Sequence, residues 1–255
     1  MRFSVLGSGS QGNSVYIESG KTGILIDAGF SGKEIETRLK AIGRDLSNVQ
    51  ALCLTHEHND HIRGVGVISR RCKIPTYSNG GTFSAGEKQM GKVFVLEEFE
   101  TGDVLQIGDL QVRSFQISYD TADPVGYVVS NGKKSVGLCT DTGKISHLIC
   151  RRLSECNGLI LEFNHNLQML KNGPYPVPLQ QRIRSTQGHL CNEDAAVLLA
   201  DLIGNHLQTV VLAHLSETNN TPELARKAAM YSVREWGDTS LIIASQEKVT
   251  ALVQL

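Results

Sequence analysis

The 255-residue sequence predicts an α/β fold, and three observations support that class. Short apolar segments typical of strands alternate with helical patterns along the chain. Several of these strands end directly at a histidine or an aspartate, which is where a rigid scaffold presents reactive side chains. The chain is also long enough to bury a large core, so we expect one domain over residues 1–255.

The first half of the chain combines glycine-bounded strands with two helices. Ile35, Leu39 and Ile42 fall on one helical stripe that ends at Gly43. A second helix is expected after residue 61, where apolar residues again recur at helical spacing. The strands are predicted at residues 3–6, 14–18, 23–27, 51–55, 93–96 and, with a turn near Gly108, 104–117.

The second half repeats this alternation. Asn131-Gly132 lies between two apolar runs and predicts a two-residue hairpin turn. A helix over residues 193–203 follows Asn192 as its N-cap. Another helix begins at Thr221-Pro222, with proline at the first helical position. Further strands are predicted at residues 136–140, 159–161, 210–213, 241–244 and 249–253.

Composition excludes several classes of protein. Hydrophobic residues make up 40% and charged residues 20% of the chain, as in ordinary globular proteins. The six cysteines include no Cys-x-x-Cys pair, which argues against a zinc ribbon and a disulfide framework. No apolar run approaches the ~18 residues needed to cross a bilayer, and the N-terminus lacks a signal-peptide block. We therefore expect a cytoplasmic protein, and its net charge of −1 gives no overall attraction to nucleic acid.

The run from His56 to His61 is the strongest chemical signal. It places three imidazoles and an aspartate within six residues, directly after a buried strand. Such ligands suit zinc, manganese or iron better than calcium or magnesium, which prefer oxygen. His56 and His58 can point the same way and hold one ion, while Asp60 and His61 face a second. The alternative is a solvated polar loop.

Other polar residues near strand ends are weaker signals when each is taken alone. Asp141 could bridge two metal ions through its carboxylate oxygens, or it could be an ordinary turn or cap residue. His165, His189 and His214 could be ligands or satisfied core histidines. Two metal ions would activate water and neutralise charge on an attacked phosphoryl or carbonyl group, so no serine or cysteine nucleophile is required.

Two segments could contact phosphate. Residues 7–13 are glycine-rich but lack the P-loop lysine and the dinucleotide-binding spacing, so they indicate a tight turn near the site. Ser10 and Asn13 are its candidate substrate contacts. Residues 163–192 contain no acidic residue and could bind a phosphate chain, or they could form a solvated surface loop. The basic residues of this segment are Lys171, Arg182 and Arg184.

Taken together, these residues resemble the metallo-β-lactamase superfamily. The His56–His61 run is similar to its signature motif, Asp141 to its bridging aspartate and His214 to its last metal histidine. The resemblance implies a four-layer αβ/βα sandwich with a dinuclear metal site at one edge. Within the superfamily the chain resembles the YycJ-like branch (also called WalJ or VicX), which is related to tRNase Z and RNase J. The similar segments are residues 7–14, 120–127, 140–143, 162–165, 188–196 and 213–216.

The resemblance also implies residue roles. Members of the branch act as DNA 5′-exonucleases, which implies hydrolysis of phosphodiesters in DNA or RNA. His189 resembles the histidine that related nucleases place over the scissile group, where it could protonate the leaving oxygen, and Asp60 is the second catalytic candidate. One metal ion would be held by Asp60, His61, Asp141 and His214, and the other by His56, His58 and Asp141.

One position departs from the pattern of the branch. Where the branch has His-Asp, this chain has Tyr119-Asp120. A phenol, with an unperturbed pKa of about 10, is a poor ligand until a metal ion deprotonates it. We therefore predict that the His56/His58 side is one ligand short, with water, Tyr119 or Asp120 filling in. We therefore expect the His56/His58 side to be occupied less fully by metal, or to prefer iron or manganese.

Three functional hypotheses remain open at this stage. The leading one is a metal-dependent phosphodiesterase or 5′-exonuclease that acts on nucleic acid through metal-activated hydroxide. The second keeps the hydrolase but changes its substrate to a small phosphodiester, thioester or lactone, which the near-neutral charge favours slightly. The third is a degenerate binding or regulatory protein with one metal ion, which Tyr119 keeps open.

Overall fold

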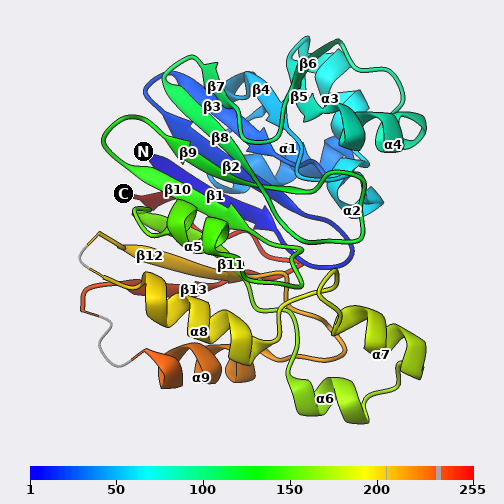
Figure 1. Ribbon diagram of the computed structural model, residues 1–255. Coiled ribbons are helices and arrows are strands. Elements are labelled where there is room, and N and C mark those ends of the chain that lie inside the picture. Colours follow the sequence, from blue (N-terminus) through cyan, green and yellow to red (C-terminus); the bar gives the residue numbers. More distant parts are fainter. Residues whose placement is uncertain (205, 234–236) are drawn as a thin grey trace.

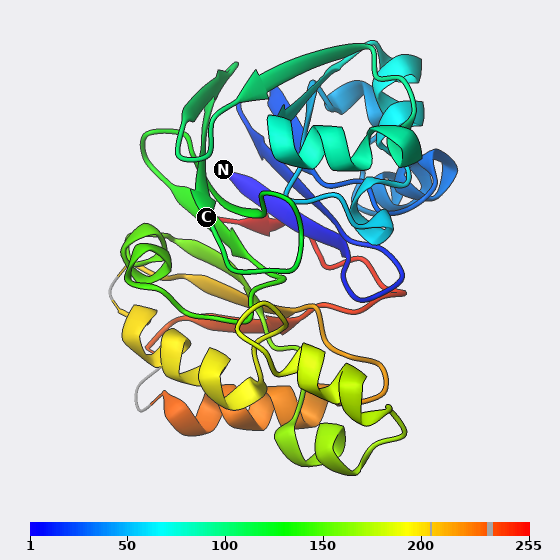
Figure 2. The ribbon, with the colours of Figure 1, turned by 45° about the vertical axis from the view of Figure 1, so that its right-hand side comes forward.

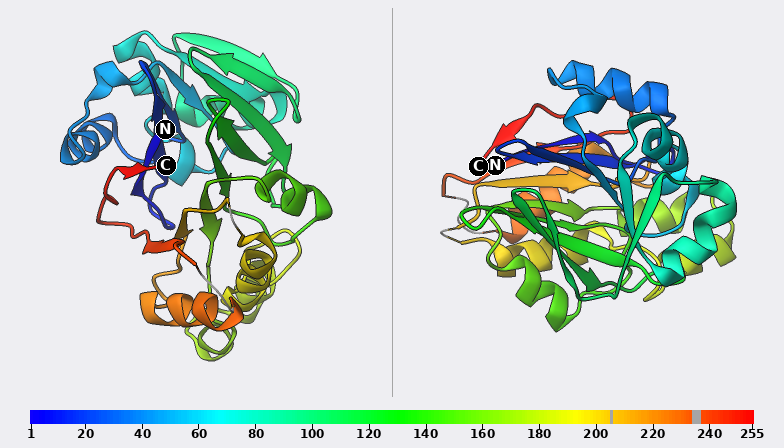
Figure 3. Two further views of the ribbon diagram at one scale, coloured as in Figure 1. Left: turned by 90° about the vertical axis from the view of Figure 1, so that its left-hand side faces the viewer. Right: turned by 90° about the horizontal axis from the view of Figure 1, so that it is seen from above.

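Two mixed β-sheets of seven strands each form the centre of the structure, a computed structural model that describes residues 1–204, 206–233 and 237–255. The sheets face each other, and helices cover the outer face of each, so the molecule has four layers (Figure 1). Figure 3 shows the same layers from two further directions, with the N- and C-termini side by side. This arrangement confirms the αβ/βα sandwich implied by the sequence.

The first sheet has the strand order β14-β1-β2-β3-β4-β5-β6. Strands β14 to β3 pair antiparallel, whereas β3 to β6 run parallel. Parallel neighbours need crossover connections, and these place helices on the outer face of the sheet. The strands are β1 (Arg2–Gly7), β2 (Ser14–Ser19), β3 (Thr22–Ile26), β4 (Ala51–Cys53), β5 (Pro75–Asn79), β6 (Val95–Phe99) and β14 (Val253–Gln254).

The second sheet repeats this design, with the order β13-β12-β11-β10-β9-β8-β7. Strands β7 to β10 form an antiparallel meander, and β10 to β13 run parallel. Its two central parallel strands, β11 and β12, are buried along their whole length, as expected for strands covered on both faces. The strands are β7 (Val104–Ile107), β8 (Leu110–Gln116), β9 (Val125–Ser130), β10 (Ser135–Cys139), β11 (Gly158–Glu162), β12 (Thr209–Ala213) and β13 (Ser240–Ile243).

Three apolar clusters hold the layers together. One lies between the two sheets, a second packs α1 and α3 on the first sheet, and a third packs α5, α8 and α9 on the second. The predicted helical stripe of Ile35 and Leu39 is fully buried in the second cluster. No helix within the described ranges is long and apolar enough to cross a membrane. The helices are α1 (Gly32–Ala41), η1 (Leu46–Asn48), α2 (Asn59–Ile62), α3 (Val65–Cys72), α4 (Gly80–Met90), α5 (His147–Leu153), α6 (Leu167–Asn172), α7 (Val177–Ile183), α8 (Asn192–Leu202) and α9 (Pro222–Ser232).

The hairpin predicted at Asn131-Gly132 joins β9 and β10, but its turn is centred one residue later. The Asn131 backbone N–H donates to the Lys134 carbonyl at 3.1 Å, so Gly132 and Lys133 occupy the central positions. The Asn131 side-chain oxygen accepts hydrogen bonds from the N–H groups of Lys133 and Lys134. Asparagine is thus used at the flank of the turn, where its side chain can satisfy these backbone donors.

The two predicted helix starts have different outcomes. Thr221 caps α9 through its side chain, with Pro222 at the first helical position, as predicted. Asn192, in contrast, is already the first residue of α8, and the capping group is the Cys191 thiol, which accepts from the Asp194 N–H at 3.4 Å. The Asn192 side chain is instead buried and donates to Asn220 at 2.9 Å.

The strand predicted at residues 249–253 is wrong over most of its length. Only its last residue pairs with β1, because Thr250 is used for tertiary contacts instead. Its hydroxyl accepts from the Val5 N–H at 2.9 Å, and its carbonyl accepts from the Ser4 hydroxyl at 2.8 Å. The chain end is therefore fixed to β1 by the Thr250 side chain as well as by backbone bonds, such as that from the Thr250 N–H to the Val5 carbonyl at 3.0 Å.

Residues 163–192, expected as a loop, contain the short helices α6 and α7. The Asn166 side chain caps α6 by accepting from the N–H groups of Gln168 and Met169, and Pro176 precedes α7. Figure 2 shows both helices projecting beside the second sheet. Each helix is too short to show a clear apolar period, so the sequence did not predict them. The strand β5 and helix α4 were not predicted either.

Candidate metal centre

Three of the polar residues that follow strands adopt an unusual backbone conformation. Asp27 follows β3, Asp141 follows β10 one residue later and His214 follows β12, with φ values of 59°, 58° and 56°. A left-handed conformation costs a residue with a side chain on the order of 1–3 kcal/mol and is concentrated at functional sites. At each position the strand has just ended, and the side chain of the residue enters a cluster shared by both sheets.

The run that follows β4 is held in place by contacts with neighbouring loops. The Asp60 carbonyl accepts from the Asn13 N–H at 2.7 Å, and the Gly29 N–H donates to the Asn13 carbonyl at 2.9 Å. A side chain at position 29 would place its Cβ 1.6 Å from the Asp60 carbonyl oxygen, so only glycine fits there. This packing fixes the start of α2, which carries Asp60 and His61.

His61 is oriented by Asp27, a residue for which the sequence suggested no role. Its Nδ1 donates to Asp27 Oδ2 at 2.8 Å, and Asp27 also accepts from the backbone and hydroxyl of Thr55 at 2.9 and 2.7 Å. This leaves His61 Nε2 directed at the centre, 3.5 Å from both Asp60 Oδ2 and Asp141 Oδ2. Burial alone would lower the pKa of His61, but Asp27, Asp141 and Asp60 outweigh it and raise that pKa well above its ordinary value.

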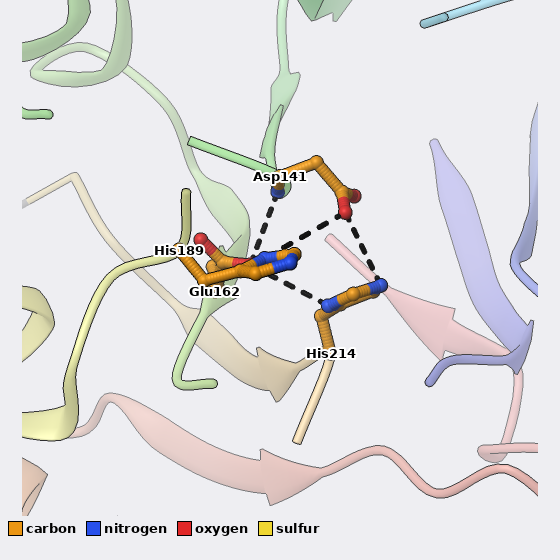
Figure 4. Close-up of side chains that lie close together, drawn as sticks. All are labelled: Asp141, Glu162, His189 and His214. Atoms are coloured by element: carbon orange, nitrogen blue, oxygen red, sulfur yellow. Dashed lines mark hydrogen bonds and ion pairs between the residues drawn. The ribbon is translucent and has the colours of Figure 1, made fainter. Parts of the chain in front are cut away.

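On the second sheet, Glu162 organises two histidines (Figure 4). This fully buried carboxylate ends β11 and lies 2.7 Å from His189 Nδ1 and 3.4 Å from His214 Nδ1. It also accepts from the backbone N–H groups of Asp141 at 3.2 Å and Leu190 at 3.0 Å. Burial opposes its ionisation, but His189 and His214 hold the pKa of Glu162 well below its usual range. His214 Nε2 consequently faces Asp141 Oδ1 at 3.2 Å.

The ligand atoms at the centre fit a divalent metal ion. Among the described residues, His56 Nε2 and Asp141 Oδ2 have no hydrogen-bond partner, although these residues are only 0% and 1% exposed. Such orphaned buried atoms cost free energy unless another group satisfies them. Three sets of ligand atoms each lie within 4.8 Å of one another among the described residues, and one of them combines Asp141, Glu162, His189 and His214. The two sets that include the His56–His61 run are His56, His61 and Asp141, and Asp60, His61 and His214. Imidazole and carboxylate ligands of this kind suit a transition metal.

Tyr119 lies beside the remaining histidines of the run. Its ring makes edge contacts with those of His56 and His58, with centroids 5.1 and 5.2 Å apart. Its hydroxyl lies 3.2 Å from His189 Nε2, while His189 Nδ1 lies 2.7 Å from Glu162 Oε1. Burial, followed by the charges of Asp141 and Glu162, raises the pKa of Tyr119 far above its ordinary value. The phenol in this environment is neutral.

The sequence also matches known proteins. The family model of the metallo-beta-lactamase superfamily matches residues 7–153. The exodeoxyribonuclease YycJ of Bacillus anthracis is 40% identical over 239 residues, which cover 93% of this chain and 90% of that protein. The exodeoxyribonuclease WalJ of Streptococcus pneumoniae serotype 2 is 41% identical over 228 residues, covering 88% and 85%. This chain belongs to the metallo-β-lactamase superfamily.

Solved structures of the superfamily share the fold over the full length. YhfI from Bacillus subtilis superposes with a TM-score of 0.76 at 16% identity, covering 98% of each chain. The short form of human tRNase Z superposes with a TM-score of 0.67 at 16% identity, covering 100% of each chain. These distant neighbours support the metallo-β-lactamase architecture and no more detailed conclusion.

Within this superfamily fold, the structure brings together most of the residues suggested as ligands. His56, Asp60, His61, Asp141 and His214 all contribute to the two sets of ligand atoms. His58 belongs to neither set in the described chain, although its ring lies 4.9 Å from that of His56. His165 is also outside both sets. It is buried, its Nδ1 lies 3.2 Å from Asn164 Oδ1, and burial lowers its pKa to about 4.

Unlike most of the candidate ligands, the candidate phosphate contacts do not all lie together at the centre. Ser10 is exposed beside the centre, whereas Asn13 is buried, and its amide nitrogen donates to Asp60 Oδ2 at 3.0 Å and lies 2.9 Å from His61 Nε2. Asn13 therefore positions ligands. Arg182 pairs with Asp120 at 2.6 Å, so its charge is already partly compensated. Lys171 and Arg184 are exposed and form no ion pair with any described residue.

Two functional residues were missed from the sequence. Asp27 and Glu162 each terminate a buried apolar strand, and each orients histidines that face the centre. A lone carboxylate at the end of a buried strand was the available signal, since a buried charge needs partners. The partners themselves come from distant segments, so the sequence alone did not identify them.

Proposed function

We propose that this chain is a metal-dependent exodeoxyribonuclease that hydrolyses phosphodiester bonds from a DNA end, with 5′ polarity. The observation that carries the proposal is the buried imidazole and carboxylate centre next to the Glu162–His189 pair, in which His56 Nε2 and Asp141 Oδ2 lack a hydrogen-bond partner among the described residues. Relatives named exodeoxyribonucleases align over about nine tenths of the chain and support the choice of substrate.

The residues of the centre divide the reaction between them. A divalent metal ion held by Asp60, His61, Asp141 and His214 would lower the pKa of water and neutralise charge on the phosphoryl group. Asp60 stays ionised, because the charges of His61 and His214 keep its pKa low although burial opposes this. Its carboxylate can therefore hold the ion and accept a hydrogen bond from the attacking water.

His189 would act as the proton donor to the leaving group. Glu162 holds its Nδ1 at 2.7 Å and so orients the ring, and Nε2, when it carries a proton, can donate that proton to the oxygen of the departing strand. The ring stacks on His214 with centroids 5.2 Å apart, which places it directly beside the centre. The Tyr119 hydroxyl, which bonds the same Nε2, steadies the ring before substrate arrives.

The two halves of the metal centre differ in this proposal. The half with Asp60, His61 and His214 would bind its ion tightly, and the half with His56, His58 and Tyr119 weakly, with iron or manganese favoured over zinc. The difference in metal affinity rests on Tyr119, because a neutral phenol there replaces an imidazole in the weaker half.

The test compares DNA with small esters. Protein loaded with zinc or manganese is incubated with single- and double-stranded DNA labelled at the 5′ or the 3′ end, beside a closed circular DNA. We expect mononucleotides released from the 5′ end of linear DNA, an intact circle, and loss of activity in Asp60→Asn. A panel of a generic small phosphodiester, a thioester and a lactone is run in parallel. Turnover of any of these without cleavage of DNA would overturn the proposal.

A further inference from the structure

A pocket of about 170 Å³ opens directly beside the catalytic histidines. His189 and His214 line it together with residues of α7 and Tyr175, which precedes Pro176. The pocket is thus continuous with the centre where the phosphodiester is cleaved. In Figure 2, α6 and α7 stand at the end of the second sheet as a separate pair of helices.

The two sides of this pocket have different chemistry. The α7 side presents the ring of Tyr175 and the side chains of Leu179 and Ile183, which are one helical turn apart and therefore share a face. All three are only partly buried, and α7 has no fully buried residue. An apolar face beside a catalytic centre is thus left for another molecule to cover.

The pocket also has a fixed rim. Arg182, which lines the pocket, pairs with Asp120 at 2.6 Å, and Asp120 is adjacent to Tyr119 in the loop after β8. The Gln180 side chain donates to the Tyr175 carbonyl at 2.8 Å, which holds the start of α7. These bonds keep the apolar face of α7 next to His189.

We propose that this pocket binds the nucleobase of a nucleotide next to the cleaved phosphodiester, with the ring of Tyr175 as its stacking surface; the inference rests on the proposed nuclease function. An aromatic ring flanked by aliphatic side chains accepts any base, because every base has a flat apolar face. The phosphate of the same nucleotide then reaches His189 and His214, which also line the pocket. The pocket therefore favours a nucleotide that has a base but does not distinguish one base from another.

The experiment measures how much the nucleobase raises kcat/KM. Oligonucleotides with intact nucleotides are compared with oligonucleotides carrying an abasic tetrahydrofuran analogue at the first or second position from the attacked end. For the wild-type protein we expect kcat/KM to fall on the order of 10-fold at one of these positions, because one stacked base is lost. In Tyr175→Ala the intact and abasic substrates should be cleaved at nearly the same rate, whereas Tyr175→Phe should retain the preference.

Two matched variants separate the loss of base stacking from a nonspecific effect of substitution on the protein. Val177→Ala alters the same helix at a side chain that is 63% exposed and does not line the pocket. Tyr231→Ala removes an 89% exposed tyrosine from α9. Both should retain the preference for an intact base. A second measurement uses 2-aminopurine next to a cleavage-resistant phosphorothioate, and its fluorescence should be quenched by the wild-type protein and not by Tyr175→Ala.

The outcomes also distinguish this inference from the proposed function. If the wild-type protein cleaves no DNA at all, the nuclease assignment itself is wrong. If it cleaves DNA but treats intact and abasic ends alike, or if Tyr175→Ala keeps the full preference, the base pocket is wrong and the nuclease assignment stands.

Discussion

The two halves of the candidate metal centre both draw on the His56–His61 run, yet the protein supports their side chains unequally. On one half, Asp27 orients His61 at 2.8 Å and Asn13 holds Asp60 at 3.0 Å. On the other, His56 Nδ1 contacts the Thr55 hydroxyl at 3.0 Å, and His58 has no hydrogen bond to any described residue through its ring. Supporting residues orient ligands and raise their affinity for metal. The comparison teaches that a signature motif specifies ligands, whereas the surrounding residues decide how well each half binds.

The largest expected effect comes from removing a supported ligand. His61→Ala should abolish retention of metal through gel filtration and lower kcat/KM by more than the roughly 10–100-fold typical of changing a residue that only supports a metal ligand. His58→Ala is the matched control, because it deletes the same side chain from the less supported half. We expect that variant to keep one ion per chain, measured by elemental analysis. Equal loss of metal from both variants would remove the distinction between the halves.

The next effect concerns Glu162, which acts through two histidines. Glu162→Gln keeps the size of the side chain but removes the charge that faces His189 and His214. We expect kcat to fall by about 10- to 100-fold, as is typical when a residue that orients ligands is changed. KM should change little. A pH–rate profile gives the additional readout, since a weaker partner for His189 should shift the limb that reports the proton donor. An unchanged profile with unchanged kcat would exclude this role.

A smaller effect should follow from restoring an imidazole. Tyr119→His is expected to raise metal affinity of the weaker half by about 10-fold or more, because an imidazole replaces a neutral phenol. Metal content is measured after dialysis against a graded series of chelator concentrations, with Tyr119→Phe as the control that removes only the hydroxyl. Identical metal content and identity in the wild-type protein and Tyr119→His would show that position 119 does not limit occupancy.

The smallest effect concerns DNA affinity outside the centre. Arg184→Ala should reduce the slope of log affinity against log salt by about one, as expected when one phosphate contact is lost. Arg182→Ala should change the slope less, because Arg182 is already paired with Asp120. Binding is measured at several salt concentrations with a cleavage-resistant oligonucleotide. If the Arg182/Arg184 double alanine leaves both affinity and slope unchanged, the basic segment does not bind phosphate.

Much of the fold was predictable from local patterns. The strands at the start of the chain and the hairpin near Asn131 were predicted because alternation, glycine and β-branched residues act over a few neighbours. The helices α6 and α7 were not, since each has about two turns and no apolar period. The N-cap of α8 was also misplaced by one residue, because Asn192 forms a tertiary bond with Asn220 instead.

The sequence by itself determined which ligand types the centre contains. The spacing from His56 to His61, and single residues such as Asp141 and His214 near strand ends, are local features that can be read along the chain. Only the tertiary structure decided which residues support them. Asp27 and Glu162 meet their histidines 34 and 27 residues away, across strands whose order in the sheets is not written in any local pattern. Electrostatic and hydrogen-bond contacts depend on distances in space, so the unequal support of the two halves emerged only once β2, β3 and β4 were placed side by side in the first sheet.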